Sequence, residues 1–226
     1  MRCVVSYLVA LLSLGTSAAF AATPAPANDE QKTLYALGLA ISQSLGVFNL
    51  NESELELVKS GITDGVFKKT PKVELQTFGP KIQILQQARA SVVADAEKKA
   101  GAAFLAKAAA EHGAKKTESG AILTMIKEGK GATPKATDTV KVHYHGTLTD
   151  GTVFDSSVKR GEPATFGLNQ VIKCWTEGVQ LLKVGSKGKL TCPSDLAYGD
   201  KGAPPTIKPG STLVFEVELL EIVAAK

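Results

Sequence analysis

The chain has 226 residues, of which 44% are hydrophobic and 21% are charged, as in an ordinary folded protein of one or two domains. This composition excludes a wholly disordered chain. The formal net charge of +4 is only mildly basic, and no cluster of lysines and arginines alternates with aromatic residues, so nucleic acid is not an expected partner.

The first 21 residues have the pattern of an export signal. Arg2 precedes an apolar run from Val4 to Leu14, and small residues follow as far as Ala21. The run is shorter than a membrane span requires, and no comparable run occurs later. The pattern therefore predicts a signal peptide at residues 1–21 and an exported protein without a membrane span after cleavage. A periplasmic location is expected first, and a secreted or outer-surface location is the alternative.

Two short helices are predicted in residues 22–76. Asn28 or Asp29 can cap the first helix, Gly46 marks its end, and Asn51 followed by Glu54 predicts a capping box for the second. Helices this short bury little apolar surface alone, so a partner is expected. Apolar residues recur at helical spacing, at Leu34, Leu37, Ile41 and Leu45 in the first helix and at Leu55, Val58, Ile62 and Val66 in the second.

Residues 77–114 are rich in alanine, glutamine, lysine and glutamate and predict one long helix that ends near His112. Pro80 is expected in its first turn, where a missing N–H costs little, although a kink between two helical pieces is the alternative. Such a helix extends roughly 50 Å at about 1.5 Å per residue. We interpret it as a stalk that holds the C-terminal domain away from the N-terminal helices, with Gly101 as its weakest point.

Residues 115–226 predict an antiparallel sheet around one short helix. An edge strand begins at Ala121, and the run from Val142 to Ser157 indicates a strand, a primed hairpin turn at Asp150-Gly151 and a return strand. A short buried helix carries Trp175, and a turn-rich loop follows Cys192. The last strand, Thr212 to Ile222, has one apolar face formed by Leu213, Phe215, Val217 and Leu219.

Five blocks occur in order in this region: VHYHGTLTDGTVFDSS, PATF, QVIKCW, PSDLAYG and TLVFEVELLEI. With these blocks the chain resembles the FK506-binding-protein (FKBP) family of peptidyl-prolyl cis-trans isomerases. The helical N-terminal part is similar to that of the macrophage-infectivity-potentiator (Mip) and FkpA-type branch. The resemblance implies an α+β protein: an N-terminal helical dimerisation segment and a long stalk helix, then a C-terminal antiparallel half-barrel sheet wrapped around one short helix.

The resemblance also implies what the protein acts on and binds. The substrates would be proline-containing unfolded chains or peptides, no cofactor would be required, and macrolides of the FK506 type would be inhibitors. A homodimer would form through residues 29–76. The alternative function is a dimeric chaperone or binding module for unfolded or surface partners, with isomerisation as an auxiliary activity.

The family pattern assigns a pocket to particular residues. Trp175 would form the floor beneath the proline ring, or only pack in the core, and Tyr198 would donate a hydrogen bond to a substrate carbonyl. Arg160 would pair with Asp155, or remain a surface charge. The predicted catalytic residues are Tyr144, Phe154, Asp155, Trp175, Tyr198 and Phe215, and the predicted substrate-binding residues are Phe166, Val171, Ile172, Ile207 and Arg160.

Two departures from the family pattern affect this pocket. Ala164 and Ala203 stand where small cytosolic relatives have phenylalanine and histidine, so the pocket is expected to be more open on that side. A more open pocket is expected to change the affinity for macrolide ligands and the preference for the residue before proline.

Cys174 and Cys192 form an even pair once Cys3 leaves with the signal peptide. In an oxidising compartment such a pair is expected to form a disulfide, and two buried thiols are the alternative. His143 and His145 share one strand face without a third ligand at suitable spacing, so no metal site is expected and exposed strand histidines are the better interpretation.

Overall fold

The computed structural model describes residues 25–223, so the predicted signal peptide at residues 1–21 lies outside the described part of the chain. The chain forms two compact units that divide between Leu39 and Ala40. Within residues 25–223 the search for membrane spans finds no helix that is both long and apolar enough to cross a bilayer.

The N-terminal helices begin at the predicted caps. Helix α1 (Asp29–Leu45) follows Asn28, whose Oδ1 accepts a hydrogen bond of 2.9 Å from the backbone N–H of Gln31. A short 3₁₀ helix, η1 (Gly46–Phe48), leads to α2 (Glu52–Val66), where Asn51 and Glu54 form the predicted capping box. No residue of α1 or α2 is buried in the described chain, although both helices carry the predicted apolar positions.

Helix α3 (Leu75–Ala109) is the predicted long helix, but its ends differ from the prediction. It starts before Thr77, so Pro80 lies in its second turn rather than its first, and it continues through the proline. The cost is small because Pro80 removes only the bond to the carbonyl of Gln76, near the helix start. The helix ends before His112, and the chain turns at Gly113, where φ is +76°.

The second half of α3 lies against the C-terminal domain, so this half does not stand clear of the domain as a stalk would. Its buried residues, Ala94, Gly101 and Ala108, recur every seven residues on one face. A β-carbon at Gly101 would clash with the hydroxyl of Thr212, and one at Gly210 would clash with the backbone of Ala94. Gly101 is therefore a point of close contact, rather than the weak point that we expected.

Seven antiparallel strands form the sheet, in the order β1-β2-β6-β7-β3-β4, with β5 also paired to β3. This confirms the α+β fold class. The expected edge strand β2 pairs on both sides, because the short β1 covers its outer edge. The strands are β1 (Lys115–Lys116), β2 (Ile122–Lys127), β3 (Thr139–Leu148), β4 (Val153–Ser156), β5 (Ala164–Gly167), β6 (Lys187–Cys192) and β7 (Leu213–Val223).

The hairpin between β3 and β4 has a three-residue loop, so the predicted primed turn is wrong. The N–H of Leu148 bonds to the carbonyl of Thr152 at 2.8 Å, and the N–H of Gly151 bonds to the carbonyl of Leu148 at 3.1 Å. Gly151 has a positive φ of +87°, whereas Asp150 does not have the positive φ that a primed turn requires. The glycine therefore serves as the left-handed residue that follows a type I turn.

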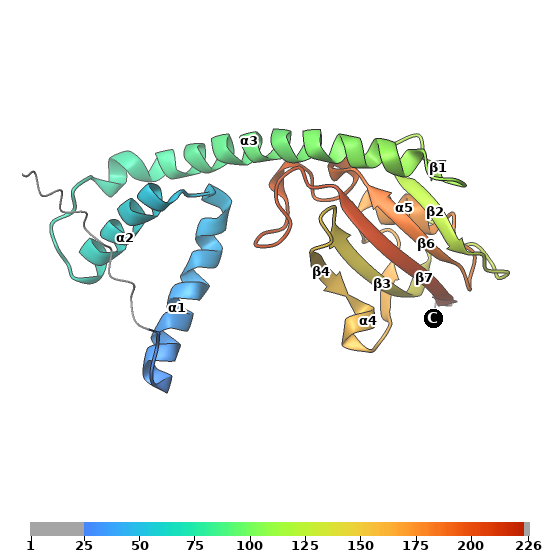
Figure 1. Cartoon of the computed structure of the whole chain (residues 1–226), viewed down its shortest axis with the longest axis horizontal. Coiled ribbons are helices and arrows are strands. Elements are labelled where there is room, and N and C mark those ends of the chain that lie inside the picture. The colour runs from blue at the N-terminus through green and yellow to red at the C-terminus, as the bar shows by residue number, and fades with distance from the viewer. Residues whose placement is uncertain (1–24, 224–226) are drawn as a thin grey trace, which may run out of the picture. The chain divides into compact units, whose positions relative to one another are not determined.

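The core lies between the sheet and helix α5 (Lys173–Val179), and Figure 1 shows β6, β7 and β3 side by side next to this helix. The helix ends at Val179, and the chain takes up a positive φ of +88° at Gly185 before β6. The short elements η2 (Ser194–Leu196) and η3 (Gly199–Lys201) belong to the loop between β6 and β7, and α4 (Ser157–Arg160) follows β4. On β7 the buried face contains Leu213, Phe215, Val217 and Leu219, as predicted.

Candidate active site

A cavity of about 720 Å³ opens beside α5. Strands β3, β4, β5 and β7 supply one part of its lining, and the loop between β6 and β7 supplies another. All the predicted pocket residues line it except Arg160. The lining residues are Tyr144, Phe154, Asp155, Phe166, Gln170, Val171, Ile172, Trp175, Tyr198, Ala203, Pro204, Pro205, Thr206, Ile207 and Phe215.

Trp175 is the centre of an aromatic cluster in this cavity. Its ring lies edge to face with the ring of Tyr144 at 5.3 Å, that of Phe166 at 5.7 Å and that of Phe215 at 5.3 Å between centroids. Phe154 extends the cluster through Phe215 at 5.4 Å. Trp175 is 4% exposed and belongs to the hydrophobic core, so it both packs in the core and lines the cavity.

The polar wall of the cavity is formed by the side chains of Tyr144 and Asp155, and Arg160, which does not line the cavity, bonds to both. The hydroxyl of Tyr144 donates to the carboxylate of Asp155, and the guanidinium of Arg160 donates to the same carboxylate and, at 3.0 Å, to the Tyr144 hydroxyl oxygen. Asp155 reaches Tyr144 because β4 pairs with β3, and α4 then returns Arg160 toward both residues. The structure thus confirms the expected pairing of Arg160 with Asp155.

These contacts decide the charge state of Asp155. Partial desolvation raises the pKa of Asp155, but the hydrogen bonds from Tyr144 and Arg160 outweigh it and hold the pKa below its ordinary value. Burial, followed by the hydrogen bond to Asp155, raises the pKa of Tyr144. At neutral pH the wall therefore contains a carboxylate and a neutral phenol, which can polarise the cavity but do not form an acid–base pair.

Tyr198 lies between η2 and η3 in the loop between β6 and β7, and its side chain is 42% exposed. Within residues 25–223 its hydroxyl has no hydrogen-bond partner, so the phenol is free to donate to a bound molecule. The loop is held by backbone hydrogen bonds of 2.8 and 3.0 Å between Ala203 and Ile207. A further bond of 3.2 Å, from the N–H of Gly202 to the carbonyl of Tyr198, holds the backbone at Tyr198, and both Tyr198 and Ile207 line the cavity.

Sequence reasoning missed several lining residues. Pro204, Pro205 and Thr206 lie between two predicted pocket residues, but their Gly/Pro-rich context indicated only a turn-rich loop. Gln170 directly precedes the predicted Val171, and nothing in its own type distinguished it. Of the two departures from the family pattern, Ala203 lines the cavity. Ala164 is not among the lining residues and packs against the core from β5.

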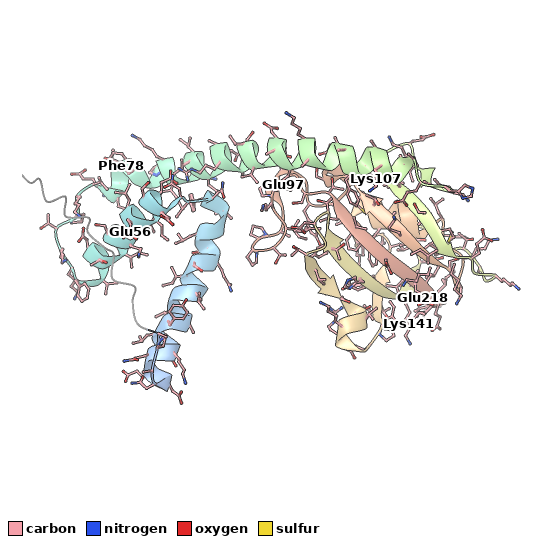
Figure 2. All side chains as sticks on the ribbon, viewed as in Figure 1. Glu56, Phe78, Glu97, Lys107, Lys141 and Glu218 are labelled. Atoms are coloured by element: carbon pink, nitrogen blue, oxygen red, sulfur yellow. A yellow bond between two sulfur atoms is a disulfide. The ribbon has the colours of Figure 1, made fainter. Side chains whose placement is uncertain are left out.

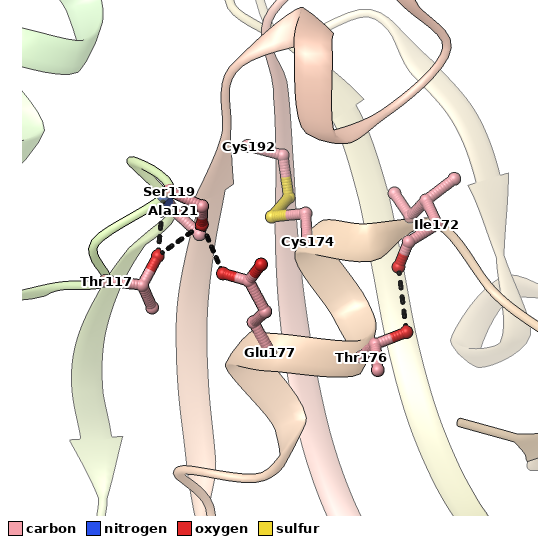
Figure 3. Close-up of a disulfide and its surroundings, with 8 residues drawn as sticks. All are labelled: Thr117, Ser119, Ala121, Ile172, Cys174, Thr176, Glu177 and Cys192. Atoms are coloured by element: carbon pink, nitrogen blue, oxygen red, sulfur yellow. Dashed lines mark hydrogen bonds between the residues drawn. A yellow bond between two sulfur atoms is a disulfide. The ribbon is translucent and has the colours of Figure 1, made fainter. Parts of the chain in front are cut away.

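Cys174 and Cys192 form the predicted disulfide, with their Cα atoms 5.7 Å apart (Figure 3). The bond joins the first turn of α5 to the end of β6, directly before the loop that carries Tyr198. Near it, Ser119 donates a hydrogen bond to the carboxylate of Glu177 on α5. The covalent link therefore holds the helix of Trp175 next to the strand from which the Tyr198 loop departs.

His143 and His145 are half-buried, so the expectation of exposed histidines is wrong. The Nδ1 atom of His143 lies 3.1 Å from the hydroxyl of Ser157, and that of His145 lies 2.9 Å from the hydroxyl of Ser156. These contacts fasten β3 to the start of α4 and give both imidazoles a structural role. In the described part of the chain, no three histidine, cysteine, aspartate or glutamate side chains gather as metal ligands.

Two family models match this chain, one over its N-terminal part and one over its C-terminal part. A family model described as "FKBP-type peptidyl-prolyl cis-trans isomerase" matches residues 130–220, and one described as "Domain amino terminal to FKBP-type peptidyl-prolyl isomerase" matches residues 30–123. The chain is 48% identical over 205 residues to the FKBP-type isomerase FkpA of Aeromonas hydrophila, covering 85% of this chain and 76% of the relative.

Two further comparisons cover nearly all of the relative. The FKBP-type 22 kDa peptidyl-prolyl cis-trans isomerase of Escherichia coli K12 is 44% identical over 204 residues, covering 88% of this chain and 98% of the relative. The crystal structure of FkpA from Escherichia coli matches with a TM-score of 0.66 at 38% identity, covering 88% of this chain and 99% of that one.

Proposed function

The chain belongs to the family of FKBP-type peptidyl-prolyl cis-trans isomerases, and we propose that it accelerates Xaa-Pro rotation in exported proteins within the cavity beside α5. It is an isomerase of the FkpA type. The assignment of catalysis to this cavity rests mainly on one observation: residues that are distant in the sequence and carry the family motifs line a single aromatic hollow.

The proposed chemistry follows from the amide bond itself. Rotation about Xaa-Pro is slow because resonance gives the C–N bond partial double-bond character, with a barrier of about 18–20 kcal/mol. Rotation breaks no covalent bond, so it requires neither a nucleophile nor a cofactor. In the twisted amide the carbonyl loses resonance and is less polar than in the planar ground state. A largely apolar cavity binds the twisted form better than water does, and this differential binding lowers the barrier.

We assign roles to the lining residues on this basis. The ring of Trp175 supports the pyrrolidine ring, and the hydroxyl of Tyr198 donates a hydrogen bond to a carbonyl of the substrate. Asp155 is a positioning residue: its carboxylate holds the Tyr144 hydroxyl away from the apolar floor. The low pKa of Asp155 supports this role, because a group that stays ionised does not donate a proton during rotation.

The test is isomerisation of an Xaa-Pro tetrapeptide by the whole protein and by the Tyr198→Phe variant. Loss of one hydrogen bond to the transition state is expected to lower kcat/KM about tenfold. Tyr35→Phe is the matched control, because Tyr35 lies exposed on α1. Equal rates for Tyr198→Phe and the unmodified protein would remove Tyr198 from the mechanism. If the unmodified protein did not isomerise the peptide faster than the spontaneous reaction, the proposed site would be rejected.

We also propose a periplasmic homodimer with a holding-chaperone activity. The support is the apolar surface of α1 and α2, where large hydrophobic side chains such as Leu34 and Leu57 are exposed in the single chain. Fractionation of cells that produce the protein tests its location. Suppression of aggregation of an unfolded protein, compared between the unmodified dimer and a monomeric variant, tests the chaperone role. Competition between an FK506-type macrolide and an Xaa-Pro peptide tests whether such inhibitors enter the cavity.

A further inference from the structure

A second hollow of about 660 Å³ adjoins the cavity. One wall is η1, the floor is the part of α3 from Gln83 to Val93, and the other wall is the loop from Asp200 to Pro209. We call this hollow the α3 groove. Pro204, Pro205 and Ile207 line both the cavity and the α3 groove. The two hollows therefore lie on either side of the same part of the loop, residues 204–207, which we call the loop tip.

Both walls of the α3 groove are fastened to α3. On one side Arg89 donates a hydrogen bond of 2.8 Å to the carbonyl of Phe48 in η1 and bonds to the carboxylate of Glu54. These contacts hold η1 and the start of α2 against the helix. The η1 wall is thus fixed to α3 by a charged, half-buried side chain.

The opposite wall is fastened by ion pairs to the loop between β6 and β7. The ammonium of Lys98 lies 2.7 Å from Asp200, and Glu97, labelled in Figure 2, lies 3.3 Å from the ammonium of Lys208. Because the pairs attach at both ends of the segment with Pro204 and Pro205, the loop tip is held over α3. The α3 groove is therefore bounded by a loop that is attached to α3 at two points.

The floor of the α3 groove presents unused amide groups. Gln83, Gln86 and Gln87 line it, and their spacing puts them on one helix face. Among the described residues these three side chains have no hydrogen-bond partners. Each amide has donors and an acceptor, as does every residue of an extended polypeptide backbone. Apolar surface from Val47 and Val93 lies next to them, which suits side chains of varied sequence.

We propose that the α3 groove binds, in extended form, the polypeptide segment that flanks the proline held in the cavity. The inference rests on the proposed function and defines its substrate class: long unfolded chains bind more tightly than short peptides with the same Xaa-Pro bond. The shared loop tip selects this occupant, because a chain that leaves the cavity over Pro204 and Pro205 enters the groove directly. Glutamine amides bind backbone groups whatever the sequence, as an enzyme for unfolded chains requires.

The test compares two substrates and two variants. The substrates are an Xaa-Pro tetrapeptide and a peptide with the same Xaa-Pro bond at its centre, long enough on both sides to cross the loop and fill the groove. The variant Gln83→Ala, Gln86→Ala, Gln87→Ala removes the amides and preserves helix propensity. Gln76→Ala, on the same helix but outside the groove, is the control. Thermal unfolding checks that each variant remains folded.

The triple variant is expected to raise KM for the long peptide about tenfold, with kcat and the tetrapeptide kinetics unchanged. An unchanged KM for the long peptide would overturn the inference. A shift in oligomeric state with unchanged kinetics would also overturn it, and would show that a second copy fills the groove. Anisotropy of the labelled long peptide measures binding independently of catalysis, so weaker binding to the triple variant would support the groove even if the tetrapeptide were not isomerised.

Discussion

Asp155 keeps its negative charge at the edge of an otherwise aromatic cavity because two neighbours compensate its partial burial. Tyr144 and Arg160 both donate hydrogen bonds to its carboxylate, and their effect on the pKa exceeds that of desolvation. A carboxylate fixed in this way orients the phenol and contributes a constant field. It is unsuited to proton transfer in the physiological pH range.

The direction of this pKa shift predicts how stability depends on pH. The pKa of Asp155 in the folded chain is below its ordinary value of 3.8, so the unfolded chain binds the proton more tightly. The contribution of Asp155 to the free energy of unfolding is then complete above the ordinary pKa and is lost as the pH falls through the folded pKa. Urea unfolding of the unmodified protein and of Asp155→Asn across this range measures the effect.

The difference in unfolding free energy between these two proteins should be constant near neutral pH and should shrink in acid. Asp95→Asn serves as the control, because Asp95 lies exposed on α3 and takes no part in the hydrogen bonds among Tyr144, Asp155 and Arg160. A difference for Asp155→Asn that stayed the same down to strongly acidic pH would contradict the lowered pKa.

Most of the residues that line the candidate site were predicted from the motif blocks of the sequence. Tyr144, Trp175 and Phe215 come from three such blocks, and the fold brings them into one cavity. Pro204 and Pro205 escaped prediction because prolines in a turn-rich loop indicate backbone shape and not which side faces a cavity. The hydrogen bonds of His143 and His145 likewise depend on α4 returning over β3, which local spacing does not reveal.

At the scale of elements, the second half of α3 belongs to the packing of the C-terminal domain. Its small residues recur every seven positions and let the helix approach the loop before β7 closely. The sequence suggested a free stalk because alanine-rich segments give no strong apolar pattern. A seam built from alanine and glycine buries little side-chain area, so hydrophobic periodicity does not detect it.

This packing predicts opposite effects for two glycine substitutions in α3. A β-carbon at Gly101 would clash with Thr212, so Gly101→Ala should destabilise the protein by about 1–3 kcal/mol despite its better helix propensity. At Gly79 the nearest atom to an added β-carbon is 3.9 Å away, so Gly79→Ala should stabilise by up to about 1 kcal/mol. Urea unfolding measures both, and equal stabilisation by the two changes would contradict the close contact at Gly101.

The disulfide links α5 to β6 and closes a loop with a sequence separation of 18. Restricting the unfolded chain in this way contributes about 3 kcal/mol to the free energy of unfolding. A reducing agent should therefore lower the urea midpoint of the unmodified protein. The double variant Cys174→Ala, Cys192→Ala should start from a lower midpoint and be insensitive to the reducing agent. An unmodified protein whose midpoint does not respond to complete reduction would contradict this contribution.

At the scale of the whole molecule, α1 carries apolar residues that the single chain leaves exposed. Leu37 is 57% exposed and Ile41 is 42% exposed, one helical turn apart on the same face. A surface of this kind requires a cover, and the proposed cover is a second copy of the N-terminal region. The helical spacing and the cap of α1 were predicted from the sequence, whereas the identity of the covering partner came only from the family resemblance.

If α1 forms the dimer interface, changing its apolar residues should abolish the dimer and leave isomerisation of a short peptide intact. Leu37→Glu together with Ile41→Glu should give a monomer in light-scattering measurements, because the charges cannot be buried at an apolar interface without a partner. The rate of tetrapeptide isomerisation per chain should be unchanged, since neither Leu37 nor Ile41 lines the cavity. Gln43→Glu adds charge to the same helix and serves as the control. A double variant that remained dimeric would place the interface elsewhere.

Trp175 is the single tryptophan of the chain and lies on the floor of the cavity, so its indole N–H reports directly on occupation of the site. The decisive measurement follows this resonance by NMR during titration with an Xaa-Pro peptide, and measures the cis–trans exchange rate of the peptide in the same samples. If catalysis takes place in this cavity, the Trp175 resonance shifts as the peptide binds and exchange accelerates in proportion to the bound fraction. Accelerated exchange with an unmoved Trp175 resonance, or a shifted resonance without acceleration, would contradict catalysis in this cavity.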